Sequence, residues 1–225
     1  MNYQHIVKGK FLSRPNRFIA LVELDGRVEK CHVKNTGRCK ELLLEGATVL
    51  LERAEEKGAR KTLYDLVAVY KGDMLVNIDS SAPNAVAKSD LSRFYGADAV
   101  ILPEQRYGDS RLDFCVLKGE RRIFVEVKGV TLEREGIVLF PDAPTDRGTK
   151  HLRELMRALG EGHEAMVLFV VQMEGMKGFL PNDDTDPVFG RTLRQARDAG
   201  VLVRVIDCTV TRDALAAGKE LPLLF

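Results

Sequence analysis

The sequence predicts two joined domains, a small antiparallel β-barrel followed by an α/β domain with a mixed sheet. Residues 6–78 contain six short stretches of apolar and β-branched residues separated by turn signals, as a barrel of short strands requires. Residues 84–210 alternate helical and strand patterns instead, which is typical of α/β domains. A chain of 225 residues, 45% of them hydrophobic, is long enough to bury both cores. We divide it into residues 1–80 and 81–225.

The first domain is expected to be a Greek-key barrel of the OB type. Asp25-Gly26 and Gly72-Asp73 are good two-residue hairpin turns. A short helix is expected to begin at Thr36 and to be closed by Gly46, and several short strands with one helix after the third indicate this barrel. A plain β-meander would give a similar pattern, and this alternative stays open. The expected strands span residues 6–12, 17–24, 27–33, 47–52, 62–70 and 74–78.

The second domain is expected to begin after residues 80–84, a Ser-, Pro- and Asn-containing run typical of a boundary. Thr145 or Asp146 is a good N-cap for its second helix. Asp186-Pro187 opens the third helix in the favoured order of cap and then proline, and Gly200 closes it. The expected order is helix 84–95, strands 111–118, 121–132 and 137–140, helix 145–159, strand 165–171, the third helix and strand 201–210.

Charge is informative through its distribution, because the formal net charge is only +1. The first forty residues carry an excess of cations over Glu23, Asp25 and Glu29. Such an excess predicts a phosphate-binding surface, in which Arg14 and Arg17 are DNA-binding candidates. A solvated β-surface rich in Lys and Arg explains the pattern equally well. The cations are Lys8, Lys10, Arg14, Arg17, Arg27, Lys30, Lys34, Arg38 and Lys40.

The sequence predicts a soluble, cytoplasmic protein. Its four cysteines form no C-x-x-C pair, so they are expected to be reduced core residues. Lysines and arginines occupy the N-terminus where a signal peptide would need an apolar stretch. The longest apolar run, residues 165–171, is too short to cross a bilayer.

The most informative stretch is the hairpin predicted over residues 111–128. Gly119-Glu120 suits a two-residue type II′ turn, which pairs Lys118 with Arg121. In this register one face is entirely apolar and is expected to be buried, which fixes the register a second time. Its cross-strand pairs are Val116 with Ile123, Phe114 with Val125, and Leu112 with Val127.

On the other face of this hairpin Asp113 falls directly opposite Glu126, and Arg111 opposite Lys128. Paired β-carbons lie roughly 4.5–5.5 Å apart, and like charges at that distance are destabilising. A protein keeps such a pair by protonating one carboxyl group or by placing a cation between the two. Mg²⁺ suits two carboxylates and several waters. The pair therefore predicts a metal site at Asp113 and Glu126, with Lys128 beside it.

The same residues allow a plainer interpretation. Alternating charges are common on an exposed strand, and the diagonals Arg111–Glu126 and Asp113–Lys128 would form a salt-bridge ladder of little energetic value. Two valines flank Glu126 in an otherwise apolar strand, which favours a central strand and hence the site. A β-bulge between positions 113 and 126 would break the pairing.

An Asp followed by Glu-x-Lys on the next strand, within helix, three strands, helix and strand, resembles the core of the PD-(D/E)XK nuclease superfamily. The resemblance implies that Asp113 and Glu126 bind Mg²⁺ or Mn²⁺, with the Val127 carbonyl as a third candidate ligand. It also implies that Lys128 positions or activates the attacking water. The implied chemistry is metal-assisted phosphodiester hydrolysis. No proline directly precedes Asp113, a departure that many members of the superfamily share.

Further positions are candidates for binding phosphate. Arg147 and His151 lie four residues apart and share one helix face near its N-terminus, where the helix dipole favours anions. Lys150 is next to them, and a solvated helix face is the alternative. Asn35 and Arg38 lie in the expected short helix of the barrel and could also hold a phosphate, although an Asn or Thr helix cap is as good an explanation.

The whole chain resembles the sugar fermentation stimulation protein A family. The resemblance implies an N-terminal OB fold, a nuclease-like second domain, non-specific DNA binding and a regulatory link to sugar metabolism, notably that of maltose. Two functions therefore stay open, a metal-dependent DNA nuclease and a catalytically silent DNA-binding regulator. The oligomeric state is open as well, with a homodimer as one option. The matching segments are residues 32–38, 110–114, 126–131, 140–151 and 190–197.

Overall fold

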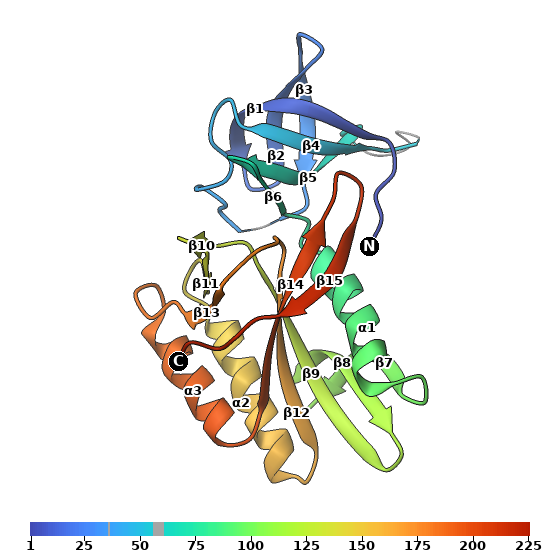
Figure 1. Cartoon of the computed structure of the whole chain (residues 1–225), viewed down its shortest axis with the longest axis vertical. Helices are drawn as coiled ribbons and strands as arrows, with labels where there is room; N and C mark the ends of the chain where they lie inside the picture. Colours follow the sequence, from blue (N-terminus) through green and yellow to red (C-terminus); the bar gives the residue numbers. More distant parts are fainter. Residues whose placement is uncertain (36, 56–60) are drawn as a thin grey trace.

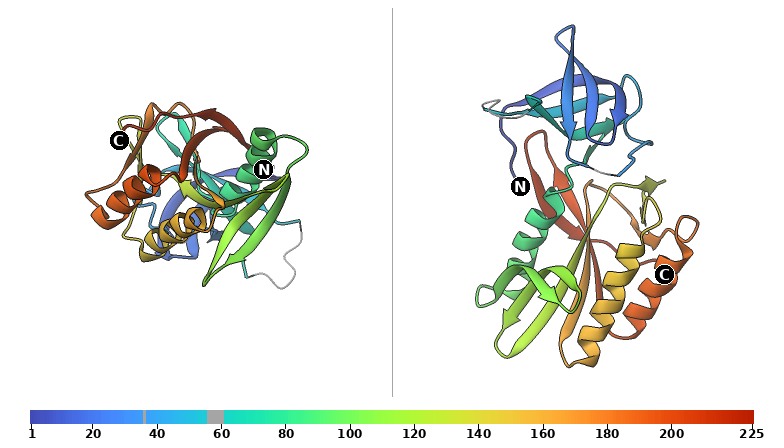
Figure 2. Two further views of the ribbon diagram at one scale, coloured as in Figure 1. Left: turned by 90° about the horizontal axis from the view of Figure 1, so that it is seen from below. Right: turned by 180° about the vertical axis from the view of Figure 1, so that it is seen from behind.

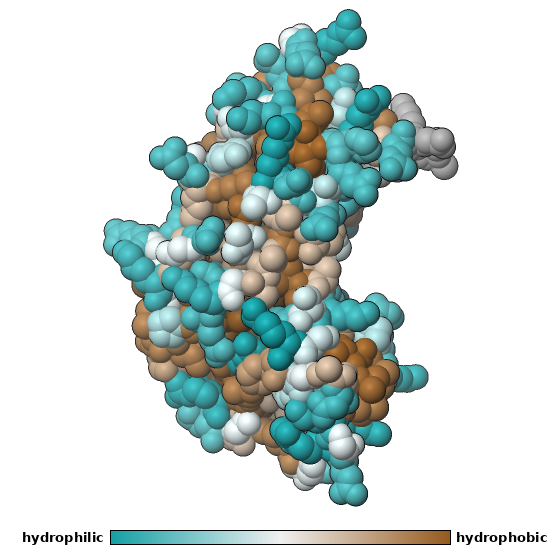
Figure 3. Space-filling view, turned by 45° about the vertical axis from the view of Figure 1, so that its right-hand side comes forward, coloured by the Kyte–Doolittle hydropathy of each residue, from teal (hydrophilic) through white to brown (hydrophobic). Residues whose placement is uncertain are grey.

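The computed structural model describes residues 1–35, 37–55 and 61–225. A barrel stands at one end of an elongated molecule and an α/β domain at the other, and the hairpin of the last two strands points from the second domain toward the barrel (Figure 1). On the face in Figure 3 the outline narrows between the two domains. Within the described ranges, no helix is both long and apolar enough to span a membrane.

The first domain is a closed barrel of the OB type, as predicted. Its strands follow the order β3-β2-β1-β4-β5-β6, and a parallel pairing of β3 with β5 closes the sheet on itself. That closure, together with the pairing of β1 with β4, excludes a plain meander. The strands are β1 (Ile6–Asn16), β2 (Ile19–Leu24), β3 (Arg27–Val33), β4 (Thr48–Arg53), β5 (Tyr64–Lys71) and β6 (Met74–Asn77).

Both predicted hairpin turns form, and the predicted short helix does not. Asp25, Gly26 and Gly72 have positive φ angles, as tight hairpin turns require. Thr36 lies outside the described residues, and residues 37–46 contain only turns. The helix is interrupted because Cys39 has a φ angle of 46°, which is incompatible with a right-handed helix.

The second domain is built on a mixed sheet of order β15-β14-β12-β9-β8-β7. Strand β12 runs parallel to β9 and β14, and the other neighbours are antiparallel. Its elements are α1 (Ala82–Tyr95), β7 (Val100–Tyr107), β8 (Ser110–Lys118), β9 (Arg121–Val130), β10 (Glu133–Arg134), β11 (Ile137–Phe140), α2 (Asp146–Gly160), β12 (Glu164–Val171), β13 (Gly178–Pro181), α3 (Pro187–Asp198), β14 (Leu202–Val210) and β15 (Leu215–Glu220).

The sheet is covered on both faces, with α1 on one side and α2 and α3 on the other (Figures 1 and 2). Alternate residues of β9 therefore enter two different cores. Ile123 and Val125 pack with α1, whereas Phe124 packs with the core that contains residues of α2 and α3. Because side chains alternate along a strand, Glu126 is directed toward the α2 face.

Two features of the second domain differ from the expectation. Strands β7, β10, β13 and β15 were not predicted, and the predicted strand 137–140 joins β10 and β13 in a separate small sheet. Pro103 and the positive φ of Glu104 interrupt the pattern of β7. Proline is tolerated there because β7 is an edge strand.

The two predicted helix caps are confirmed, and they are linked to each other. The Thr145 hydroxyl accepts a hydrogen bond from the N–H of Gly148 at 3.0 Å. One carboxylate oxygen of Asp186 accepts from the N–H of Phe189 at 2.9 Å, and the other accepts from the N–H of Thr145 at 2.8 Å. Asp186 thus fixes the starts of α2 and α3 together.

A polar contact joins the two domains. The side-chain N–H groups of Gln172 donate to the Asn77 side-chain oxygen at 2.8 Å and to the Asp79 carbonyl at 3.0 Å. All three residues are at most 2% exposed. An ion pair between Lys71 of the barrel and Glu133 of the second domain lies across the same junction.

Candidate metal centre at the domain junction

The hairpin register is confirmed over most of its length and is wrong at the site. Five pairs form, from Lys118 with Arg121 to Phe114 with Val125. The next pairs that the register predicts, among them Asp113 with Glu126, are not part of the ladder. Instead, the Asp113 carboxylate accepts a hydrogen bond from the backbone N–H of Val127 at 2.8 Å.

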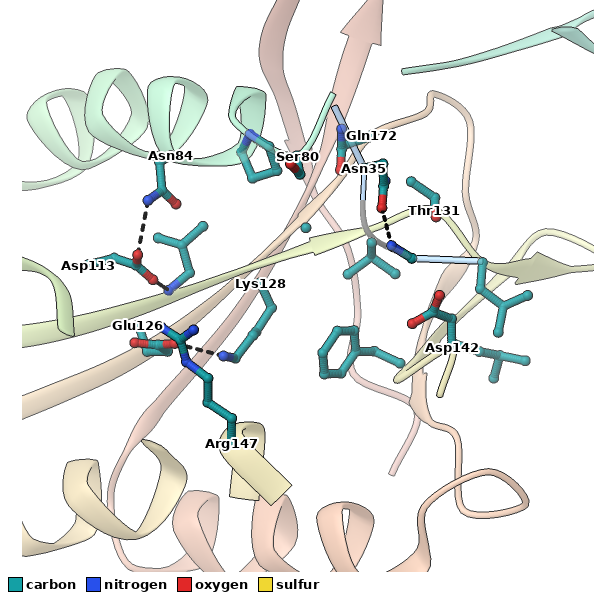
Figure 4. Close-up of a pocket in the computed structure, with 18 residues that line it drawn as sticks. Asn35, Ser80, Asn84, Asp113, Glu126, Lys128, Thr131, Asp142, Arg147 and Gln172 are labelled. Carbon is teal, nitrogen blue, oxygen red and sulfur yellow. Dashed lines mark hydrogen bonds and ion pairs between the residues drawn. The ribbon is translucent and has the colours of Figure 1, made fainter. Parts of the chain in front are cut away.

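The ladder ends there because side-chain alternation in β8 breaks at Asp113. Leu112 packs in the same core as Cys115, whereas Phe114 packs in the α1 core. The break coincides with the irregularity at Glu104 on the neighbouring strand β7, where the pairing skips one residue. Asp113 and Glu126 therefore approach the same pocket from different sides of β9 rather than as a flat cross-strand pair (Figure 4).

Glu126 is buried at 3% exposure, and two basic side chains hold one of its oxygens. Oε1 accepts hydrogen bonds from Lys128 Nζ at 2.7 Å and from His151 Nδ1. Burial alone would raise the pKa of Glu126, but the His151 hydrogen bond and the Lys128 charge outweigh it and lower that pKa below its ordinary value. The other oxygen, Oε2, is buried and has no hydrogen-bond partner in the described part of the chain.

Asp113 is held by one side chain and one backbone group. Besides the N–H of Val127, the Asn84 side chain at the start of α1 donates to its carboxylate at 2.9 Å. Burial and then the negative charge of Glu126 raise the pKa of Asp113 above its ordinary value, and these two hydrogen bonds oppose the rise only in part. The groups around Asp113 therefore do not fully offset the cost of its negative charge.

Both carboxylates line a pocket of about 470 Å³ between the domains. Arg147 extends into it from the start of α2, and Gln172 borders it at the end of β12 (Figure 4). The barrel contributes Asn35 and Gly37. The pocket thus has an acidic floor from the second domain, one cation from α2 and one wall from the barrel.

The donor set fits a hard divalent cation. Two carboxylates supply the oxygen ligands that Mg²⁺, Mn²⁺ and Ca²⁺ prefer, and Oε2 of Glu126 has no hydrogen-bond partner among the described residues. A cation there would also offset the charge that raises the pKa of Asp113. No group of three His, Cys, Asp or Glu converges within residues 1–35, 37–55 and 61–225, so a cation there would be held by the two carboxylates together with other oxygen atoms.

The predicted phosphate-binding residues of α2 fall in three different environments. Arg147 is exposed and lines the pocket. His151 is buried and hydrogen-bonded to the Glu126 carboxylate, so it holds that carboxylate in place. Lys150 is exposed, is not among the residues that line the pocket, and donates to the Asp109 carbonyl at 3.4 Å.

The predicted basic residues of the barrel gather around residues 35–38. The Arg14 guanidinium donates to four backbone carbonyl groups there and in the β1–β2 turn. Arg17 and Arg38 are exposed. The Asn35 side chain accepts from the N–H of Gly37 at 2.7 Å and donates to the Ile78 carbonyl at 3.0 Å, which ties this segment to the domain junction.

Asn84 and Gln172 are two residues of the pocket that the sequence does not predict as site residues. Asn84 falls where the sequence predicts the domain boundary and the start of a helix, and no local signal marks it as a partner of Asp113. Gln172 did carry a signal, since it follows directly after the apolar run 165–171. Polar groups at the carboxyl ends of buried parallel strands are common at ligand sites.

The fold and the pocket together define a class of protein. In this class a closed OB-like barrel is joined to a mixed-sheet α/β domain. A pocket lined by carboxylates and a lysine lies at the junction of the two domains. The chain belongs to the sugar fermentation stimulation protein (SfsA) family. The SfsA N-terminal OB domain matches residues 12–78, and the sugar fermentation stimulation protein RE domain matches residues 81–214.

Relatives with this name match nearly the whole chain. The sugar fermentation stimulation protein homolog of Desulfitobacterium hafniense is 53% identical over 219 residues, which cover 97% of this chain and 96% of that protein. The homolog of Clostridium beijerinckii is 50% identical over 220 residues, or 96% of each chain.

A solved structure has the same arrangement. The structure of Pyrococcus furiosus SfsA in complex with Ca²⁺ matches with a TM-score of 0.88 and 27% sequence identity, over 100% of this chain and 98% of that one. The similarity extends over both domains, so the two-domain fold of this chain is that of SfsA.

Proposed function

We propose that this chain is a DNA-binding, largely sequence-non-specific nuclease that depends on Mg²⁺ or Mn²⁺. The observation that carries the proposal is the buried, partnerless Oε2 of Glu126 beside Asp113, whose pKa is raised. A divalent cation between the two carboxylates would offset the charge that raises the pKa of Asp113. The Ca²⁺ complex of the Pyrococcus furiosus relative supports the choice of a hard, oxygen-preferring ion.

In this proposal Asp113 and Glu126 would hold the cation, which would supply activation of water and compensation of the charge that develops on the phosphate. Lys128 lies 2.7 Å from Glu126 and is directed into the same pocket, where it would orient the attacking water. Arg147 would bind a phosphate oxygen of the DNA from the other wall. His151 is buried against Glu126 and would act as a positioning residue, because its hydrogen bond fixes the orientation of that carboxylate.

The second candidate is a catalytically silent DNA-binding regulator linked to sugar metabolism, notably that of maltose. The name that the relatives carry, sugar fermentation stimulation protein homolog, favours a role of this kind. The basic side chains of Lys128 and His151 also neutralise Glu126 without a metal, as a structural carboxylate requires.

The test is a cleavage assay on end-labelled single-stranded, duplex and branched DNA, with Mg²⁺, Mn²⁺ or EDTA. The chain is compared with Glu126→Gln and Lys128→Ala, and Glu120→Gln in the exposed turn of the same hairpin serves as the charge-matched control. Metal-dependent cutting that is lost in the first two variants and kept in the control supports the nuclease. DNA binding without cutting on every substrate and with every ion would leave the regulator.

A further inference from the structure

The barrel carries a second pocket next to the carboxylate pocket. It has a volume of about 510 Å³, and Gly37 lines both pockets, so the two are neighbours. Phe11 and Leu43, which are 3% and 9% exposed, form an apolar floor together with Leu12. We call this pocket the barrel groove.

Three cationic side chains border the apolar floor of the barrel groove. Arg17, Arg38 and Lys40 are all exposed. Over the described ranges none of the three forms an ion pair or donates a side-chain hydrogen bond. Glu45 lines the groove too, but the cations outnumber it. An apolar floor with a positive rim fits a ligand that has a flat apolar part and repeated negative charges.

The groove is held in shape before any ligand binds. The Arg14 guanidinium donates to the carbonyl groups of Arg17 at 2.7 Å, Gly37 at 2.8 Å and Arg38 at 2.9 Å. These bonds fix the β1–β2 turn and the segment after β3 relative to each other. A preformed surface loses less conformational entropy on binding.

An exposed aromatic ring continues this surface. Phe18 is 43% exposed, and the Arg17 guanidinium lies over its ring at 4.7 Å from the centroid. Phe18 also lines an apolar hollow that shares Ser80 with the carboxylate pocket. The Arg17–Phe18 tip therefore lies beside two hollows, each of which shares a lining residue with the carboxylate pocket.

We propose that the barrel groove and the Arg17–Phe18 tip bind an unpaired DNA strand, which leads into the carboxylate pocket. The inference rests on the proposed nuclease function and names its substrate class, DNA with a single-stranded segment. Bases in a duplex are covered by their neighbours and cannot enter an apolar pocket. An unpaired base can lie on the floor or stack on Phe18, while its phosphates pair with Arg17, Arg38 and Lys40.

Binding is tested in EDTA, where no cutting occurs, so the result does not depend on the nuclease. Fluorescence anisotropy measures the affinity of a labelled oligothymidylate of about 12 nucleotides and of a blunt duplex of equal length. The groove variant carries both Arg17→Ala and Arg38→Ala. The control variant carries both Arg27→Ala and Lys30→Ala, which remove two exposed cations that line neither the barrel groove nor the carboxylate pocket. Phe18→Ala tests stacking at an exposed position.

The chain is expected to bind the strand more tightly than the duplex. The groove variant should lose strand affinity by roughly tenfold or more. It should also reduce the slope of log affinity against log salt by roughly 1.4. The control should change the strand affinity by less than about twofold. Phe18→Ala should weaken strand binding by about tenfold. Unchanged Tm values exclude misfolding.

Equal losses in the groove and control variants, or duplex binding at least as tight as strand binding, would overturn the inference. Binding of a labelled acidic, Phe-containing peptide in place of the strand would assign the groove to a protein partner and overturn it as well. If the chain binds the strand through the barrel groove but never cuts DNA, the inference about strand binding stands and the nuclease proposal fails. These two failures are therefore distinguishable.

Discussion

The buried imidazole of His151, on α2, donates a hydrogen bond from Nδ1 to the carboxylate of Glu126, on β9. Both residues are at most 5% exposed, so water cannot replace the partner that either would lose. The contact ties the first turns of a helix to the floor of the candidate metal centre. The Glu126 side chain is consequently held in one orientation.

We predict that His151→Ala lowers the free energy of unfolding by about 2 kcal/mol in EDTA, because a hydrogen bond to a buried charge is lost. Saturating Mn²⁺ should recover part of the loss, since the cation takes over the charge of Glu126. Urea denaturation with and without Mn²⁺ measures both effects. Arg147→Ala, an exposed change on the same helix, is the control. An equal deficit in both conditions would mean that no cation reaches Glu126.

Without metal, Asp113→Asn should raise the free energy of unfolding, whereas His151→Ala lowers it. Burial and the charge of Glu126 raise the pKa of Asp113, so the folded state binds its proton more tightly than the unfolded chain does. The ionised group therefore costs stability as pH rises from its ordinary pKa through the raised one. The variant should be more stable than the parent by about 0.5 kcal/mol at neutral pH in EDTA.

The same variant should lose stabilisation by metal. Thermal unfolding of parent and Asp113→Asn, titrated with Mn²⁺, measures this second effect. The parent Tm should rise with Mn²⁺ concentration and the variant Tm should stay constant. A variant that is less stable than the parent in EDTA, yet is equally stabilised by Mn²⁺, would contradict the assignment of Asp113 as a ligand.

Much of the fold could be predicted because it depends on local patterns. The turn at Gly119-Glu120 and the apolar alternation fixed the hairpin register as far as Val125, since both act on neighbouring residues. The break at Asp113 could not be predicted. Leu112 and Phe114 are both apolar and suit either core, and the irregularity that accompanies their placement in different cores lies on another strand, at Glu104.

The proximity of the predicted carboxylates and lysine agrees with the structure better than their predicted contacts do. Asp113, Glu126 and Lys128 do line one pocket, because the strand order brings them together. The contact of His151 with Glu126 spans 25 residues and depends on how α2 packs on the sheet, which no local pattern reports. The missing barrel helix has a similar cause, since Arg14 binds the carbonyl groups of that segment from another strand.

Asp186 should be the most pH-sensitive cap of the second domain. Burial alone would raise its pKa, but hydrogen bonds from the backbone N–H groups of Phe189, Thr145 and Val188 outweigh it and lower the pKa. A carboxyl group with a lowered folded pKa stabilises the protein above its unfolded pKa, and this contribution is lost as pH falls through the folded value.

We therefore expect Asp186→Ala to lower the free energy of unfolding by about 2 kcal/mol at neutral pH. The difference from the parent should shrink below about pH 4, the ordinary range of an aspartate. Asp184→Ala, an exposed neighbour, should change stability by less than about 0.5 kcal/mol. Urea denaturation across the pH range measures both. A deficit that is constant with pH would mean that the carboxylate charge has no part in the cap.

Gln172 is expected to couple the unfolding of the two domains. Gln172→Ala removes the hydrogen bonds to Asn77 and Asp79 in a buried junction, which should cost about 2 kcal/mol. Lys71→Ala removes the half-exposed ion pair across the same junction and should cost less than about 1 kcal/mol. Calorimetry should give one transition for the parent and for Lys71→Ala, and two for Gln172→Ala, because the barrel then melts independently. A single transition of unchanged Tm in Gln172→Ala would show that apolar packing alone holds the domains together.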